Sequence, residues 1–244
     1  MTPTMTITSQ LDIFPTFRRT AVLCCVVLSV QATAENLDCP NFPVPDVKVQ
    51  WVAPYMIYNG IPMSVKRMDS DKKNVEDILN FYRRVWASST PSLKPVENDA
   101  PPWKTIGVVR GKCFFSVQVQ AVGQGSTGLL SATEPEGKPR VIAADKVLPM
   151  MTGSAIVNDI EHRDDGKNAR TLLLSNAFSA ESNASFYRQN LTDQGWQILS
   201  SYQMTTAKGP GITIVLKRHL AETHIVITRE GSKTMVLANM VDQP

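Results

Sequence analysis

The chain has 244 residues, with 25 Lys and Arg against 22 Asp and Glu and 43% hydrophobic residues, a composition typical of globular proteins. This composition excludes an intrinsically disordered chain, a collagen and a polytopic membrane protein. Because the charge is nearly balanced, the sequence has no clustered basic excess of the kind that binds nucleic acid.

Residues 1–34 have the organisation of a secretory signal peptide. Two arginines, Arg18 and Arg19, precede an uncharged apolar run at 20–30, and Ala32-Thr33-Ala34 is a small-residue cleavage signal. The apolar run is much shorter than the roughly 20 residues that a membrane span needs. We therefore expect cleavage after Ala34 and a periplasmic or secreted protein without an integral membrane span. An uncleaved anchor helix is the alternative.

Cleavage would leave two cysteines, Cys39 and Cys113, in an oxidising compartment. We expect them to form a disulfide that links the N-terminal segment to a strand of the first half. Two buried thiols are the alternative, because the sequence does not give the distance between the two residues. Neither cysteine has a Cys or His at ligand spacing, so a metal site is disfavoured.

The next segment, residues 36–63, is rich in proline, aromatic residues and methionine, a composition that is enriched in interface cores. We expect an interaction surface here, formed by Trp51, Tyr55, Met56 and Tyr58. The alternative is that these side chains pack on the protein's own sheet.

Local signals then predict a hairpin and a helix. The pair Asn59-Gly60 separates two strand-like runs and predicts a tight turn, because both central positions of such a turn take positive φ. Apolar residues at helical spacing over 75–85 predict an amphipathic helix. The proline-rich stretch 88–102 is expected to be a surface loop, and Trp103 precedes further strand-like runs.

A similar series follows about 105 residues further on. A second turn pair, Asp165-Gly166, precedes a helical pattern in which Ser185-Phe186-Tyr187-Arg188 matches Asn80-Phe81-Tyr82-Arg83, and Trp196 then matches Trp103. Chance matching is the alternative to a duplication. The residues expected in the core of the two copies are Phe81, Tyr82, Trp103, Phe186, Tyr187 and Trp196.

These patterns predict an α+β protein of two repeated units, each a β-hairpin, one α-helix and a three-stranded antiparallel meander. The expected organisation is a signal peptide at 1–34, a first repeat at 35–133, a linker at 134–147 and a second repeat at 148–244.

Motifs for catalysis are weak. Gly123 to Gly128 fits G-x-G-x-x-G, but Pro135 follows too soon for a phosphate-binding helix, so a glycine-rich hairpin loop is expected. His219 and His224 are five residues apart with a predicted hairpin turn between them, which does not favour a shared metal. We therefore expect no catalytic residue, no metal ligand and no cofactor. A pair of carboxylates brought together by the fold remains the enzymatic alternative.

The order of Phe186-Tyr187-Arg188, Gly195-Trp196 and the strands up to Thr228 resembles small helix-on-sheet domains found in tandem in periplasmic accessory proteins of envelope assemblies. The resemblance implies a fold and no functional residues. It leads us to expect a non-catalytic accessory or scaffold protein of an envelope, secretion, conjugation or pilus machine, which binds a protein partner in the cell envelope and no nucleic acid. The alternative is a periplasmic binding protein for a small apolar or lipid-like ligand, held between a helix and its sheet.

Overall fold

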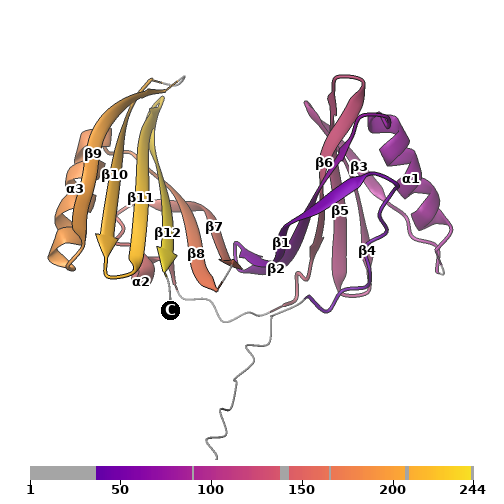
Figure 1. The fold of residues 1–244 in the computed structure, drawn as a ribbon, viewed down its shortest axis with the longest axis horizontal. Coiled ribbons are helices and arrows are strands. Elements are labelled where there is room, and N and C mark those ends of the chain that lie inside the picture. Colours follow the sequence, from indigo (N-terminus) through magenta and orange to yellow (C-terminus); the bar gives the residue numbers. More distant parts are fainter. Residues whose placement is uncertain (1–36, 90, 138–142, 165, 207–208, 243–244) are drawn as a thin grey trace, which may run out of the picture. The chain divides into compact units, whose positions relative to one another are not determined.

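The computed structural model describes residues 37–89, 91–137, 143–164, 166–206 and 209–242, all within one compact unit at 35–244. The predicted signal peptide lies outside these residues. The elements in chain order (Figure 1) are β1 (Lys48–Tyr58), β2 (Ile61–Ser70), α1 (Val75–Ala87), β3 (Val96–Ala100), β4 (Trp103–Arg110), β5 (Cys113–Val122), β6 (Gly125–Thr133), α2 (Ala144–Val147), β7 (Ala155–Asp164), β8 (Lys167–Asn176), α3 (Ala180–Asp193), β9 (Gln197–Thr206), β10 (Gly209–Arg218), β11 (Ala221–Glu230) and β12 (Lys233–Asp242).

The twelve strands form one antiparallel sheet, which confirms the predicted α+β class. The strand order is β3-β4-β5-β6-β2-β1-β7-β8-β12-β11-β10-β9. In each half the four strands after the long helix form a meander, whose last strand pairs with the second strand of the hairpin before the helix. These pairs are β6 with β2 and β12 with β8. The two hairpins meet where β1 pairs with β7.

Both predicted hairpin turns are present. In the first turn Asn59 and Gly60 have φ values of 50° and 79°, and Tyr58 pairs with Ile61 across the turn. In the second, Asp164 pairs with Lys167 and Gly166 has a φ of 77°. Positive φ at these positions is the geometry that Asn-Gly and Asp-Gly pairs allow at low cost.

Each long helix begins at a side-chain cap. Asn74 accepts a hydrogen bond from the backbone N–H of Asp77, whose carboxylate accepts one from the backbone N–H of Asn74, so α1 starts with a complete capping box. Ser179 accepts a hydrogen bond from the backbone N–H of Ser182 at 3.0 Å and caps α3. The predicted apolar face of α1 is confirmed, because Ile78, Leu79, Tyr82 and Trp86 are buried.

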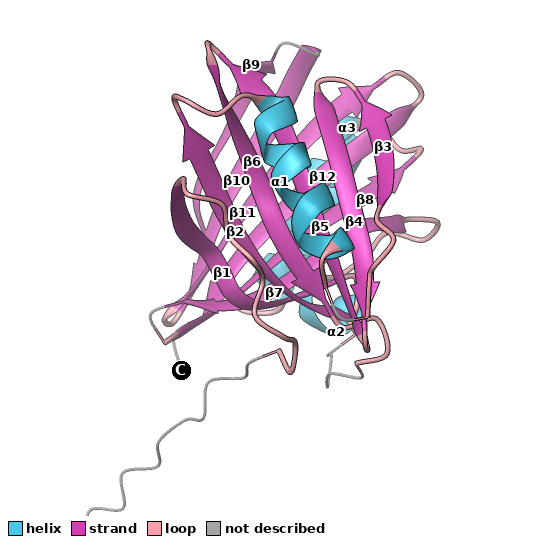
Figure 2. Ribbon diagram, turned by 90° about the vertical axis from the view of Figure 1, so that its right-hand side faces the viewer, coloured by secondary structure: helices cyan, strands magenta, loops and turns pink. Residues whose placement is uncertain are grey.

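The helices build two separate cores. Helix α1 packs on β4 and β5, where its apolar residues meet Ile106, Val108 and Val117. Helix α3 packs on β9, β10 and β11, where Tyr187 and Leu191 meet Ile214 and Ile225. Figure 2 shows α1 lying across the strands of its half. Tyr82 lies in the first core and Tyr187 in the second, and neither side chain is exposed to solvent.

An extended segment before each hairpin adds to its core. Phe42 packs edge-on against Tyr82 and Phe115, with ring centroids 5.9 and 5.1 Å apart. The Tyr82 hydroxyl donates a hydrogen bond to the carbonyl of Pro43 at 3.0 Å. In the second half Leu148, which also precedes a proline, is buried in the core after the short helix α2.

The prediction of three strands after each helix is wrong, because four follow each one. The missed strand of the first half is β3, which lies in the stretch expected to be a loop. All five of its residues are exposed, so it lacks the alternation of apolar and polar residues that marks a half-buried strand. Trp103 consequently opens the second strand after α1, whereas Trp196 directly precedes the first strand after α3.

The glycine-rich motif lies in a hairpin, as expected. Strands β5 and β6 pair up to Val122 and Gly125 across the turn. A Cβ at Gly125 would lie 1.9 Å from the backbone oxygen of Ser70, so close packing of the chain, not phosphate binding, requires a glycine there.

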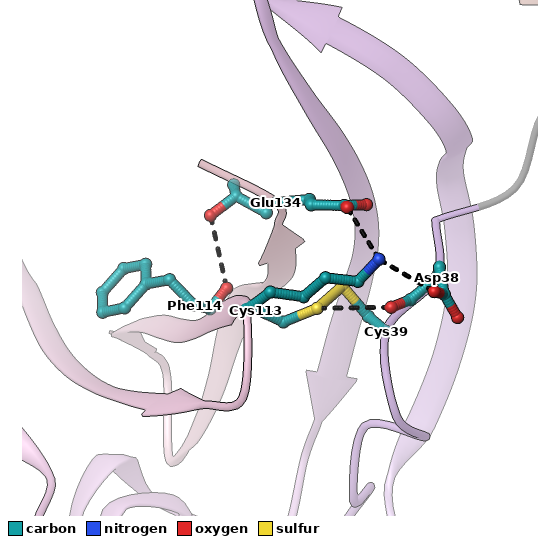
Figure 3. The surroundings of a disulfide bond; sticks show 7 residues. Asp38, Cys39, Cys113, Phe114 and Glu134 are labelled. Atoms are coloured by element: carbon teal, nitrogen blue, oxygen red, sulfur yellow. Dashed lines mark hydrogen bonds and ion pairs between the residues drawn. A yellow bond between two sulfur atoms is a disulfide. The ribbon is translucent and has the colours of Figure 1, made fainter. Parts of the chain in front are cut away.

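The disulfide between Cys39 and Cys113 is present, with its two Cα atoms 5.9 Å apart (Figure 3). It joins the N-terminal segment to the first residue of β5. Lys112, beside Cys113, makes ion pairs with Asp38 at 2.8 Å and with Glu134 at 2.9 Å. The Lys112 ammonium lowers the pKa of the Asp38 carboxyl through a hydrogen bond and its charge. A disulfide of this kind indicates an oxidising compartment.

Replacing both cysteines by alanine should lower the free energy of unfolding by about 2–4 kcal/mol, because the cross-link closes a 74-residue loop and restricts the unfolded chain. Chemical denaturation of the oxidised protein and of the double variant measures the difference. The wild-type protein unfolded in reducing agent is the matched control and should lose the same amount. Equal unfolding midpoints for the oxidised protein and the variant would contradict the prediction.

Candidate functional site

Both long helices lie on one face of the sheet. Met68 of β2 belongs to the first core, and every second residue from it, as far as Pro62, lies on the same face of the strand. Pro62 pairs with Ile57 of β1. Ile57 pairs across the junction with Glu161, which pairs with Arg170, two residues from Leu172 in the second core. Because alternate residues of a strand share a face, this path stays on the helix side throughout. We call the opposite side of the sheet the open face.

In the second half the open face carries an apolar row with a polar row beside it. Tyr202 and Leu237 are 55% and 40% exposed and belong to the same row. The pairing registers define the row as Tyr202, Thr213, Val226, Leu237, Leu173 and Asn158. The neighbouring row contains His224, Asn239 and Thr171. Exposed apolar side chains beside polar ones are typical of protein-binding surfaces.

In the first half the open face has its own apolar row. Val109 is 64% exposed and Phe114 is 38% exposed. A Cβ at Gly107 would lie 2.7 Å from the Phe114 ring, so this ring lies directly over the glycine. The row is Val109, Phe114, Thr133, Met63 and Met56, and it continues across the junction to His162. In the described part of the chain the helices α1 and α3 pack on the other side, so this row is left to solvent.

The junction between the halves is narrow. Strands β1 and β7 pair at three positions, from Met56 with His162 to Tyr58 with Ile160. Asn59 adds two hydrogen bonds of 2.8 Å to the backbone of Asp159, one from its N–H and one to its side chain. The Tyr58 hydroxyl donates to the side chain of Asn158 at 2.9 Å. Polar groups at the hairpin tips therefore supplement a short ladder.

On the helix side of the first half there is a hollow of about 300 Å³. The Lys66 ammonium lies 4.2 Å from the centroid of the Trp51 ring, and Trp51 is 54% exposed. The hollow is lined by the N-terminal segment and by strands β1, β2 and β6, through Leu37, Cys39, Pro40, Asn41, Phe42, Trp51, Pro54, Ser64, Lys66, Leu130 and Ala132. An aromatic ring, an ammonium and apolar walls are suited to a small ligand with an apolar body and an acidic group.

The second half holds a buried ion cluster at the corresponding position. The two hairpins are 106 residues apart in the sequence. At this offset Arg170 of the second half corresponds to Ser64 of the first half, and Leu172 corresponds to Lys66. Arg170 is 7% exposed and pairs with Asp159 at 2.6 Å and with Glu161 at 2.9 Å. Burial raises the pKa of the Glu161 carboxyl, an effect that the charge of Arg170 opposes.

Three of the four residues expected to form an interaction surface lie in two separate places. Trp51 faces the hollow on the helix side, whereas Met56 and Tyr58 belong to the open face near the junction. Tyr55 is half-buried in β1. Two register shifts in β1, between Trp51 and Ala53 and between Ala53 and Met56, separate these positions.

Five of the six residues expected in the two cores belong to a core or pack against one, and Trp103 is not among them. Tyr82 and Tyr187 are fully buried, and Phe81, Phe186 and Trp196 pack against the cores while partly exposed. Trp103 is half-buried in β4. Arg218 lies 4.8 Å from the centroid of the Trp196 ring, which covers one side of that tryptophan.

The residues considered for metal or acid–base chemistry are dispersed. His219 is in the turn between β10 and β11 with a φ of 53°, while His224 points outward from β11 and hydrogen-bonds to Glu222. Among the described residues, no group of three or more His, Cys, Asp or Glu is arranged to hold a metal ion. None of the helices in the described ranges is long and apolar enough to cross a membrane.

Sequence reasoning missed the Arg170 cluster and the role of Lys66. The available signal was a charged residue within an otherwise apolar strand, since Arg170 precedes Leu172, Leu173 and Leu174. A buried charge requires a partner, but the partners are on another strand and follow only from the register.

A comparison with models of known protein families found no family that matches the chain. A comparison with curated proteins likewise found no relative.

Substituting Arg170 by methionine should lower the free energy of unfolding by about 3–5 kcal/mol at neutral pH, because Asp159 and Glu161 would lose their buried cation. When folding raises the pKa of a carboxyl group, burying its charged form lowers the free energy of unfolding. This destabilisation is largest at pH values above the pKa in the folded state, and it disappears as the pH falls below the pKa in the unfolded state. The loss should therefore shrink as the pH is lowered from neutral towards 4.5, the ordinary pKa of Glu161.

The exposed pair Arg67 and Asp69 supplies the matched control. Arg67→Met should cost less than about 1 kcal/mol, because solvent screens an exposed pair. Denaturant unfolding of both variants across this pH range makes the comparison. A cost at Arg170 that is no larger than that at Arg67, or that grows as the pH falls, would contradict the account.

Proposed function

We propose that this protein is an exported, non-catalytic accessory or scaffold component of an envelope assembly such as a secretion, conjugation or pilus machine. It would act by binding a protein partner in the cell envelope. The observation that carries the proposal is the open face, a continuous antiparallel surface with exposed apolar rows in both halves. Protein partners bind such surfaces by burying the apolar centre and pairing with the polar rim.

The proposed location is periplasmic or secreted. The disulfide between Cys39 and Cys113 supports an oxidising compartment. The signal-peptide pattern at residues 1–34, with its cleavage site at Ala34, supports the same location.

We further propose that the chain arose by duplication of a unit made of a hairpin, a helix and a meander. Both halves have the same order of elements, and the strand order of the sheet reads β3-β4-β5-β6-β2-β1 in one half and β9-β10-β11-β12-β8-β7 from the other end. Phe42-Pro43 and Leu148-Pro149 recur at the offset of the hairpins. The repeats would be 35–133 and 148–244, joined by residues 134–147, which include α2.

The proposal excludes a catalytic role and a cofactor. His162, His219 and His224 lie on β7, in a turn and on β11, and this separation supports the view, because catalysis by several histidines acting together would need them in one place.

Leu237→Asp should reduce recovery of the partner about tenfold in a cross-linking pull-down of the tagged protein from its own envelope fraction, because it places a charge in the apolar row of the second half of the open face. Leu220→Asp is the matched control, since Leu220 is 63% exposed in a turn outside this face and should leave recovery unchanged. Mass spectrometry identifies and quantifies the captured proteins. Recovery that Leu237→Asp does not alter would contradict the open face as the binding surface.

A second candidate function is supported by the hollow beside Trp51. It is binding of a small apolar or lipid-like ligand, at a site between the N-terminal segment and the sheet and not between a helix and the sheet as expected from sequence. The cation over the Trp51 ring would receive an acidic group of the ligand.

Native mass spectrometry of the protein purified from the envelope fraction tests this second function. A bound small molecule should be present in the wild-type protein and reduced at least fivefold in Trp51→Ala, because the substitution removes one wall of the hollow. Trp103→Ala, which alters a tryptophan outside the hollow, should retain the molecule. Equal retention by both variants, or a wild-type protein without any adduct, would contradict ligand binding here.

A further inference from the structure

The two edge strands of the sheet differ in how open they are to pairing. In the described part of the chain, β3 ends the sheet on one side and β9 ends it on the other. An edge strand leaves every second backbone N–H and C=O without a ladder partner, and proteins normally protect such edges with short strands, charges, prolines or bulges. The comparison of β3 with β9 therefore shows which edge is protected.

Strand β3 is protected in three ways. It has five residues with the sequence VENDA, so it carries Glu97 and Asp99. Pro95 precedes it, and Pro101 and Pro102 follow it. Arg83 of α1 holds the Glu97 carboxylate through two bonds of 2.6 and 2.7 Å, which fixes one charge beside the edge. A second strand pairing here would meet acidic side chains and a ladder limited by prolines.

Strand β9 has no charge or proline of its own, although Arg188 of α3 donates two hydrogen bonds of 2.9 and 3.2 Å to the Ser201 hydroxyl. Its ten residues, QILSSYQMTT, include no charged residue and no proline. A register shift beside Leu199 interrupts the first part, but from Ser200 to Thr205 the strand pairs regularly with β10. This uninterrupted edge of six residues is longer than the three-pair ladder that joins β1 to β7 within the chain. Its length is therefore sufficient for a junction of the type the molecule already contains.

We propose that β9 pairs with β9 of a second copy of this chain, antiparallel and about a two-fold axis. The absence of charge within the strand favours self-pairing, because the residues at and beside the two-fold axis lie close to their own copies and like charges there would repel. The internal junction is a precedent, since β1 and β7, the first strands of the two halves, pair antiparallel in the same manner. Because the β3 edge is protected, the pairing closes at two copies and does not propagate into a filament.

This inference extends the proposed scaffold function. The pairing itself does not depend on that function, but its biological role rests on the proposed function. Self-pairing extends the open face across two chains, so that one assembly offers two copies of the binding surface to its partner. The edge contact and the open face share Tyr202, but they can be tested separately through Gln203, which lies on the helix side of β9, and Leu237, which lies on the open face of β12.

Two neighbouring residues of β9 provide the test. Tyr202 points to the open face and Gln203 to the helix side, since they pair with Thr213 and with the core residue Ile212, respectively. Both are exposed, so a lysine at either position leaves the fold intact while placing like charges together across the two-fold axis. Circular dichroism and the unfolding midpoint confirm folding of each variant.

Analytical ultracentrifugation of the purified, disulfide-bonded protein should give the mass of two chains. Tyr202→Lys and Gln203→Lys should each weaken dimerisation at least tenfold. Val96→Lys on the β3 edge and Leu237→Asp on the open face should leave the dimer intact. Mixing Gln203→Lys with Gln203→Glu should restore a mixed dimer, because opposite charges would then meet across the axis.

A wild-type protein with the mass of one chain at all accessible concentrations would overturn the inference. So would a dimer that withstands both β9 variants, or one that only open-face variants dissociate. Loss of the dimer in Gln203→Lys with partner recovery unchanged would support edge pairing and leave the scaffold proposal standing, because Gln203 lies on the helix side and not on the open face. Loss of partner recovery in Leu237→Asp with the dimer intact would likewise separate the two surfaces.

Discussion

Antiparallel pairing of β1 with β7 at three positions makes one sheet out of two six-stranded halves, and the other large features of the molecule depend on it. Because the ladder preserves the alternation of side chains, the cores under α1 and α3 fall on the same side of the sheet. The opposite side is then continuous and carries apolar rows. The same junction uses one edge of each half, so that β3 and β9 are the two edges that remain.

The halves have the same topology but differ at corresponding positions. Ser64 and Lys66 border a hollow, whereas Arg170 and Leu172 fill the matching place with a buried ion cluster and core packing. The Tyr82 hydroxyl finds an acceptor in Pro43, whereas the buried Tyr187 hydroxyl has no hydrogen-bond partner among the described residues. Burial raises the pKa of both phenols, so each keeps its proton at physiological pH. One half has a hollow where the other half has a buried ion cluster and core packing.

The features that sequence predicted were those with local signals. Asn59-Gly60 and Asp165-Gly166 specify turns by their own backbone preferences, and the spacing of Ile78, Leu79 and Tyr82 specifies a buried helix face. The disulfide followed from compartment and cysteine count. Strand β3 was missed because an exposed edge strand has no apolar period, and the pairing of β2 with β6 and of β1 with β7 was missed because no local pattern encodes contacts between distant strands.

The same limit applied to the candidate site. Trp51 was recognised as a possible surface residue by type, but its placement beside Lys66 depends on the register of β1 against β2. Asp159 and Glu161 carry no local signal of a buried partner, and only the pairing of β7 with β8 brings them to Arg170. The apolar row through Val226 and Leu237 is a property of six strands in register, which no single segment contains.

Site-specific photo-cross-linking in the intact envelope tests the central claim, that the open face binds a protein partner. A photoreactive residue at Leu237 or Val109 should yield adducts with the same small set of other polypeptides, because both positions are exposed on this face. The same probe at Leu220, exposed in a turn, should yield none. Adducts at Leu220 equal to those at Leu237 and Val109, or no adducts from the open face, would contradict the account.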